Sequence, residues 1–93
     1  MLVKLICLDR RTSGDYFLNE ILLNPKHIVM VKGEQTLKKR LQEGNLGIAL
    51  HPEVEFTKIV IAEGSHNKEI VVVGSPSEVE SKIFRKSKQI LRG

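Results

Sequence analysis

Hydrophobic and polar residues divide the chain into short apolar runs separated by polar turns. The run over 2–8 is apolar except for Lys4, which is typical of a strand that is covered on most of its surface. The cluster DRRTSGD follows and contains Gly14, so we expect a turn there, and 16–18 then supplies the partner strand. These two segments predict an N-terminal β-hairpin.

An Asn-Pro pair interrupts the stretch ILLNPKHIVMV and predicts a corner in the chain. Pro25 has no amide hydrogen to donate, and it disfavours the helical conformation at Asn24. The Asn24 side chain can also close an Asx turn with the backbone. We expect a strand over 28–32 to follow this corner, with His27 at its start.

The segment over 33–45 is mostly polar, with Leu37 and Leu41 four residues apart on one side. This spacing suits two turns of amphipathic helix, but such a short helix is marginal on its own. We therefore expect either a short helix or a mobile loop. The apolar positions over 46–50 predict a further short strand, which His51 and Pro52 end.

The second half of the chain predicts another hairpin and a helix. The runs FTKIVIAEG and EIVVVG flank the polar SHNK, as in a hairpin. Ser75 can then cap a helix, Pro76 suits its first position, and Glu78 completes a capping box. The apolar residues of this helix fall on one stripe, which we expect to be buried: Val79, Ile83, Phe84, Ile90 and Leu91.

The length of 93 residues suits one domain with a single core. We predict an α+β domain over 1–93, in which a twisted, mainly antiparallel sheet of about five strands, or a small open barrel, carries the C-terminal helix. Such a sheet leaves free edges. A homodimer formed through strand edges, or through the exposed side of the helix, is therefore one expectation.

Composition favours a soluble protein of the cytoplasm. Hydrophobic residues make up 41% of the chain and are interleaved with charges. No apolar run reaches the roughly 18 residues that span a bilayer, and the N-terminus is too short and too charged for a signal peptide, so we expect no membrane insertion. The single cysteine, Cys7, excludes an internal disulfide and lies in an apolar run, where we expect a buried, unreactive thiol.

Catalytic motifs are absent from the sequence. His27, His51 and His66 each lie in or beside a predicted turn, without the close spacing of metal ligands. The sequence also has no glycine-rich phosphate loop, GxSxG motif or Cys-His signature. We therefore expect no metal, no cofactor and no enzymatic activity. The preferred hypothesis is a small interaction or regulatory module that acts by protein–protein binding.

Basic residues give the alternative hypothesis. Lys and Arg outnumber Asp and Glu by 15 to 11, for a net charge of +4. Cations on one side of a helix can bind phosphates, although the helix dipole and solubility also favour them there. Lys38, Lys39 and Arg40 could add to such a nucleic-acid site. The candidate partner-binding or nucleic-acid-binding residues of the C-terminal helix are Lys82, Arg85, Lys86, Lys88 and Arg92.

The segments VKLICL, YFLNEILLNPKHIVMV, TKIVIAEG and EIVVVGSPSEVESKI follow one another as strand, hairpin, corner, second hairpin and helix. In this order the chain resembles the FlbD family of small bacterial proteins linked to flagella and swarming motility, from which it departs by an insertion over about 33–52. The resemblance implies the same architecture more than a shared activity, and the alternative is a phage or bacterial protein of another role with similar topology. The matching positions are Leu23, Asn24, Pro25, Ile28, Val31, Ile59, Ile61, Ile70, Val72, Ser75, Glu78, Val79 and Ile83.

The nucleic-acid alternative predicts a salt-dependent affinity. Labelled DNA or RNA should bind more weakly as salt rises, because phosphate contacts release counterions. Replacing Arg85, Lys88 and Arg92 together by Ala should abolish this binding and leave the fold intact. Fluorescence anisotropy at low and near-physiological salt measures the effect, and absence of binding at low salt would contradict the hypothesis.

Overall fold

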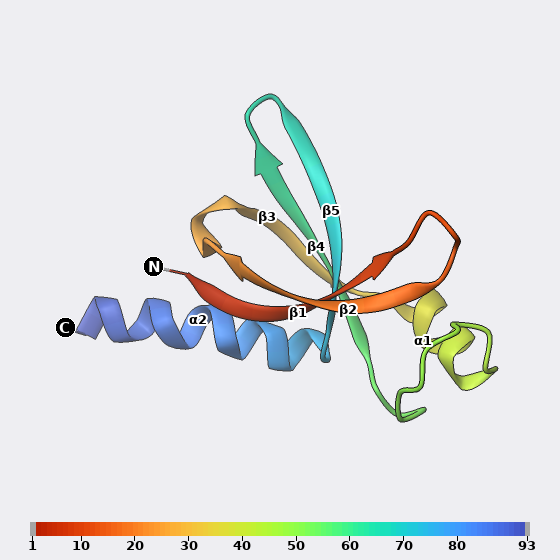
Figure 1. Cartoon of the computed structure of the whole chain (residues 1–93). Helices are drawn as coiled ribbons and strands as arrows, with labels where there is room; N and C mark the ends of the chain where they lie inside the picture. The colour runs from red at the N-terminus through yellow and green to blue at the C-terminus, as the bar shows by residue number, and fades with distance from the viewer. Residues whose placement is uncertain (1, 93) are drawn as a thin grey trace.

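Five strands form one open antiparallel sheet in the order β2-β1-β5-β4-β3, as the computed structural model of the chain shows (Figure 1). The structure describes residues 2–92, and side chains over 2–84. The strands are β1 (Val3–Arg10), β2 (Tyr16–Leu23), β3 (Ile28–Gly33), β4 (Phe56–Glu63) and β5 (His66–Val73). The helical elements are η1 (Pro25–His27), α1 (Gln35–Gln42) and α2 (Pro76–Arg92). The predicted α+β class is confirmed.

Two hairpins, β1–β2 and β4–β5, supply most of the sheet. The strands of each hairpin pair along their whole lengths. Between the hairpins, the register of β1 with β5 has one residue pair, Cys7 opposite Val72. The hairpins cross near this point and diverge away from it (Figure 1). β3 adds to β4 on the far side, so that β2 and β3 are the two edges of the sheet.

Helix α2 closes the inner face of the sheet. Val79 and Ile83 are buried against residues of β1, β4 and β5, and such burial stabilises a fold by about 1.5–3 kcal/mol for each side chain. Phe84 was predicted to be buried with them but is 53% exposed. Phe84 is the next residue after Ile83 and lies about 100° farther around the helix, so its side chain leaves the face that packs on the sheet. The side chains of Ile90 and Leu91 lie outside the described part of the chain.

The start of α2 has the predicted capping box. The Ser75 hydroxyl accepts a hydrogen bond from the Glu78 backbone N–H at 3.2 Å, and the Glu78 carboxylate accepts one from the Ser75 N–H at 3.5 Å. These bonds satisfy backbone donors that a helix start leaves without partners. Within the described residues, neither α1 nor α2 is long and apolar enough to cross a membrane.

Helix α1 and the loop after it cover part of the outer face. A short helix or a mobile loop was expected over 33–45, and the structure has the helix over Gln35–Gln42, where the Glu34 side chain accepts a hydrogen bond from the Thr36 N–H at 3.1 Å. The strand predicted over 46–50 is wrong, since this segment is a loop. Gly44 and Gly47 have positive φ angles of 76° and 72°, which interrupt an extended conformation. The apolar side chains of the loop pack instead on an outer core that contains Leu8, Leu41, Leu46 and Phe56.

The Asn-Pro corner forms as predicted. The Asn24 Oδ1 accepts a hydrogen bond from the Lys26 backbone N–H at 3.0 Å, and η1 then leads the chain into β3. β1 continues past the predicted Leu8 to Arg10, and two other strands are clearly longer than predicted. β2 extends to Leu23, because its polar positions face solvent at the sheet edge, and β5 begins at His66, because Gly64 makes the turn at a φ of 58°.

The buried Thr57 offers a test of the packing on the inner face of the sheet. This side chain is fully buried, and its hydroxyl donates a hydrogen bond to the Gly74 carbonyl at 2.8 Å. Thr57→Val keeps the side-chain shape but removes the donor, so the free energy of unfolding should fall by about 1–3 kcal/mol. Urea unfolding followed by circular dichroism measures the loss. Thr57→Ser, which keeps the hydroxyl, is the control, and a Val variant as stable as the wild type would contradict this role.

Candidate functional site

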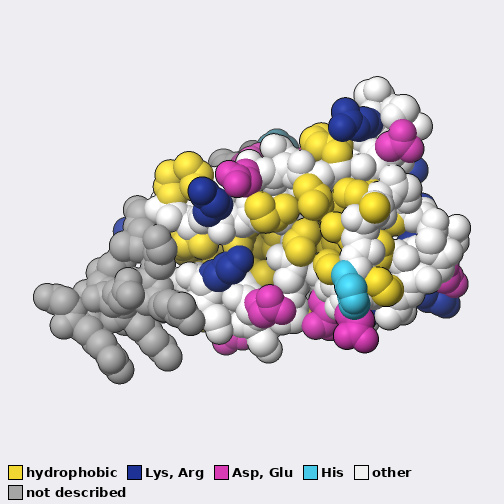
Figure 2. Space-filling model, turned by 60° about the horizontal axis from the view of Figure 1, so that its bottom comes forward, with side chains coloured by type: hydrophobic (Ala, Val, Ile, Leu, Met, Phe, Trp, Pro, Cys, Tyr) yellow, Lys and Arg dark blue, Asp and Glu magenta, His cyan; other side chains and the backbone are white. Residues whose placement is uncertain are grey.

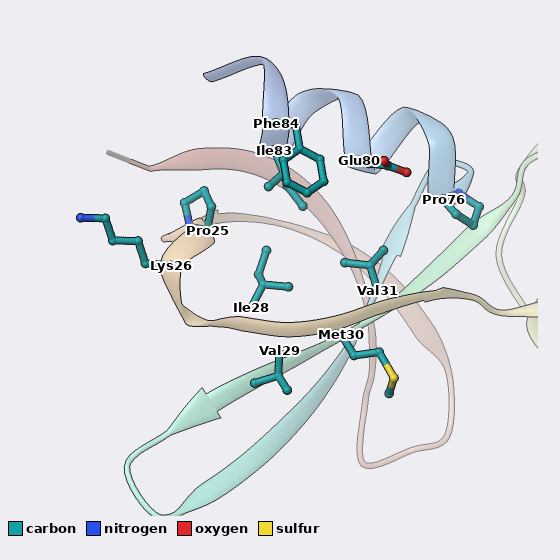
Figure 3. A pocket seen from close by; sticks show the side chains of 10 residues that line it. All are labelled: Pro25, Lys26, Ile28, Val29, Met30, Val31, Pro76, Glu80, Ile83 and Phe84. Carbon is teal, nitrogen blue, oxygen red and sulfur yellow. The ribbon is translucent and has the colours of Figure 1, made fainter. Parts of the chain in front are cut away.

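A β-bulge in edge strand β3 turns two neighbouring apolar side chains outward. Ile28 pairs with Ile61 and Met30 with Val60, so Val29 is an extra residue in the ladder. Ile28 and Val31 therefore both point toward α2, whereas Val29 and Met30 point to the opposite side (Figure 3). Val29 is 59% exposed and Met30 46%. The bulge thus gives the free edge of the sheet an apolar surface on both faces.

An apolar groove of about 520 Å³ lies where β3 meets α2. Ile28 and Val31 line its β3 side, and Ile83 and Phe84 approach them from the helix (Figure 3). Val29 and Met30 contribute to the lining at the strand edge, and residues of η1 and the start of α2 complete it: Pro25, Lys26, Pro76 and Glu80. The groove lies beside a strand edge that pairs with no other strand of the described chain.

Two exposed lysines lie beside this edge. Lys26 precedes β3 and Lys32 lies near its end. Neither has an ion-pair partner among the described side chains. On β4, in contrast, Lys58 lies 3.4 Å from Glu34 and 3.7 Å from Glu69. Lys26 and Lys32 are therefore free to meet acidic groups from outside.

Exposed hydrophobic side chains also occur elsewhere on the described surface. Leu18 and Leu22 of the other edge strand, β2, are 40% and 62% exposed. Figure 2 shows the molecule turned so that its α2 side comes forward, and hydrophobic side chains gather across the middle of this face. Acidic and basic side chains lie mostly around that area (Figure 2). The apolar surface is thus wider than the groove alone.

The predicted basic site is only partly described. Lys82 is exposed on α2, whereas the side chains of Arg85, Lys86, Lys88 and Arg92 lie outside the described part of the chain. The helper residues proposed on α1 lie at the opposite end of the molecule from the end of α2 (Figure 1).

Two of the three α1 cations also have partners of their own. Lys38 lies 3.4 Å from Glu55, and the Arg40 guanidinium lies 5.7 Å from the centre of the Tyr16 ring. The structure therefore does not join the two basic segments into one surface.

Sequence analysis missed Val29, Met30 and the groove. The run Ile28–Val31 is apolar throughout, and such a run does not reveal which side chains face outward. The bulge determines which side chains face outward, and its position follows from the pairing of β3 with β4. The exposure of Phe84, one residue beyond the buried Ile83, was equally unexpected.

The buried thiol of Cys7 has a raised pKa. Its side chain is 3% exposed, and burial together with the neighbouring Asp9 carboxylate raises its pKa from 9.0 to about 11. A thiol that stays protonated is a poor nucleophile, and the prediction of a buried thiol is confirmed. Among residues 2–84, no three His, Cys, Asp or Glu side chains come together as a metal site would require.

Comparison with known protein families, with curated proteins and with solved structures finds no match to this chain. The resemblance to the FlbD family stays a prediction. The groove, the strand edges and the charges around them are the features of this chain that bear on its function.

The raised pKa of Cys7 predicts slow alkylation and a loss of stability in alkali. At pH 8 the native thiolate fraction should be about a hundredfold smaller than in the unfolded chain, so iodoacetamide should react far more slowly without denaturant. The unfolded thiol ionises first as pH rises above 9. Stability should therefore decline between pH 9 and about 11, and less so in Cys7→Ala. Equal alkylation rates in the native and denatured protein would contradict the burial.

Proposed function

We propose that this protein is a non-catalytic interaction module that binds an extended apolar segment of a protein partner at β3 and the adjoining groove. The observation that carries the proposal is an unpaired strand edge lying directly beside an apolar groove. Other proteins bind extended peptides in this way, with main-chain hydrogen bonds for affinity and side-chain pockets for specificity.

The exposed side chains support an apolar partner segment. Val29 and Met30 lie on the outer side of β3, while Ile28, Val31 and Phe84 line the groove on its inner side. A strand added to this edge would place alternate side chains on these two faces. Both faces would then bury apolar surface, at about 25 cal/mol for each Å² removed from water.

The charges favour acidic residues beside that apolar segment. Lys26 and Lys32 lie on either side of the apolar positions of β3. Opposite charges across an interface increase the association rate and disfavour partners of the wrong sign. The proposed ligand is therefore an extended peptide that combines apolar residues with Asp or Glu.

The lining of the groove supports a binding role over a catalytic one. Lys26 and Glu80 are the titratable residues among those that line it, and its other lining residues are apolar. Catalytic sites usually bring several titratable groups into close mutual contact. Binding of apolar side chains needs an apolar lining instead.

Peptide selection tests the proposal directly. A phage-displayed library of random peptides, selected on the wild-type protein, should yield apolar peptides with acidic residues. Met30→Asp or Phe84→Asp should weaken their binding at least about tenfold, equal to about 1.4 kcal/mol, because each places a charge in the apolar contact. Isothermal titration calorimetry measures the affinities, and circular dichroism verifies the fold of each variant.

Leu2→Asp is the matched control for these variants. Leu2 is 50% exposed, close to the values for Met30 and Phe84, and it does not line the groove. The control should therefore keep its affinity for the selected peptides. The proposal is wrong if no peptide is enriched, or if all three substitutions weaken binding equally.

A further inference from the structure

The two free edges of the sheet carry opposite charges. Glu20 is the charged residue of β2 and Lys32 the charged residue of β3, and both are exposed. Lys4 is 3.9 Å from Glu20, but each side chain is 64% exposed, and a pair so exposed contributes little. Glu20 can therefore exchange this contact for another cation at small cost.

The apolar residues of the two edges lie on the same face of the sheet as these charges. Leu18 and Leu22 flank Glu20 two residues away on either side, so all three point outward from β2. On β3, Met30 shares the outer face with Lys32 and with the bulged Val29. Each edge thus presents one charge beside exposed hydrophobic side chains.

We propose that this chain binds a second copy of itself head to tail, with β2 of one copy beside β3 of the next. This inference rests on the proposed function, because it assigns the extended partner segment to β2. A continuous sheet keeps outward side chains on one face, so Glu20 can lie beside Lys32. The step of two residues then brings Leu22 beside Met30 if the strands are antiparallel, and Leu18 beside Met30 if they are parallel.

Symmetric pairing of identical edges lacks this complementarity. Two β3 strands would bring together Lys26 and Lys32 from both copies without an acidic residue from either strand. Two β2 strands would bring together Glu20 from both copies without a basic residue from either strand, and the exposed Lys4 of β1 would be the cation near them. Like charges across paired strands are destabilising, so the contact between β2 and β3 is the favoured one.

Head-to-tail contacts can join more than two copies of the chain. Each copy uses one edge to bind and leaves its other edge free, so association continues beyond two chains until a ring closes or a filament grows. The groove lies on the inner side of the same β3 edge. A β2 strand added there would place its inward face, where Ile21 is half-buried against the core of its own copy, next to the groove.

Two edge variants test the arrangement by mixing. Leu18→Asp with Leu22→Asp disables the β2 edge, and Val29→Lys with Met30→Lys disables the β3 edge. Sedimentation velocity should show wild-type association that rises with concentration and exceeds two chains. Each variant alone should be monomeric, and an equal mixture should form a complex of two chains, because it restores one intact β2–β3 contact.

Charge reversal gives a second measurement with smaller changes. Glu20→Lys should weaken self-association by about two- to fivefold, and Lys32→Glu should do the same. Combining the two substitutions in one chain should restore the wild-type affinity, because each contact again joins opposite charges. Leu2→Asp, outside both edges, should leave association unchanged.

Several outcomes would overturn the inference. The inference is wrong if the wild-type chain stays monomeric at millimolar concentration. It is also wrong if the β2-edge variant associates as well as the wild type. Failure of the proposed function is separate from these outcomes. If the groove binds another protein and not a second copy, the selected peptides should still bind more weakly to Phe84→Asp. They should bind the β2-edge variant as well as they bind the wild type.

Discussion

The narrow junction between the two hairpins determines the rest of this structure. β1 and β5 meet in register at one residue pair, Cys7 opposite Val72, whereas the strands of each hairpin pair along their whole lengths. Side-chain packing must therefore hold the hairpins together. Val79 and Ile83 of α2 supply this packing on the inner face, and the buried thiol of Cys7 lies at the junction itself.

The same junction explains where the molecule can bind. Because the hairpins diverge from one point, the sheet stays open and both β2 and β3 remain edges. Free edges usually carry protective charges or bulges that discourage pairing. Here the β3 bulge increases the apolar surface, since it turns Val29 and Met30 outward together and leaves Ile28 and Val31 facing the groove.

Local chemistry allowed much of the fold to be predicted from sequence. The Ser75–Glu78 capping box, the Asn24 turn and both hairpins depend on neighbouring residues, and the structure confirms each of them. The binding site depends on distant contacts and was not predicted. The pairing of β3 with β4 sets the bulge, and packing of α2 on the sheet decides that Ile83 is buried while Phe84 is exposed. An apolar run in the sequence shows neither the position of a bulge nor which of its residues are buried.

Amide hydrogen exchange at two protein concentrations tests the central claim most directly, because it reports backbone pairing at each strand separately. If β2 binds β3 of another copy, protection should rise with concentration over 18–22 and 28–32 together. Protection over Ile59 and Val72, within the sheet, should not change. A rise at 28–32 alone would indicate symmetric pairing of β3, and no rise at either edge would contradict the assignment of these strands as binding surfaces for a second copy.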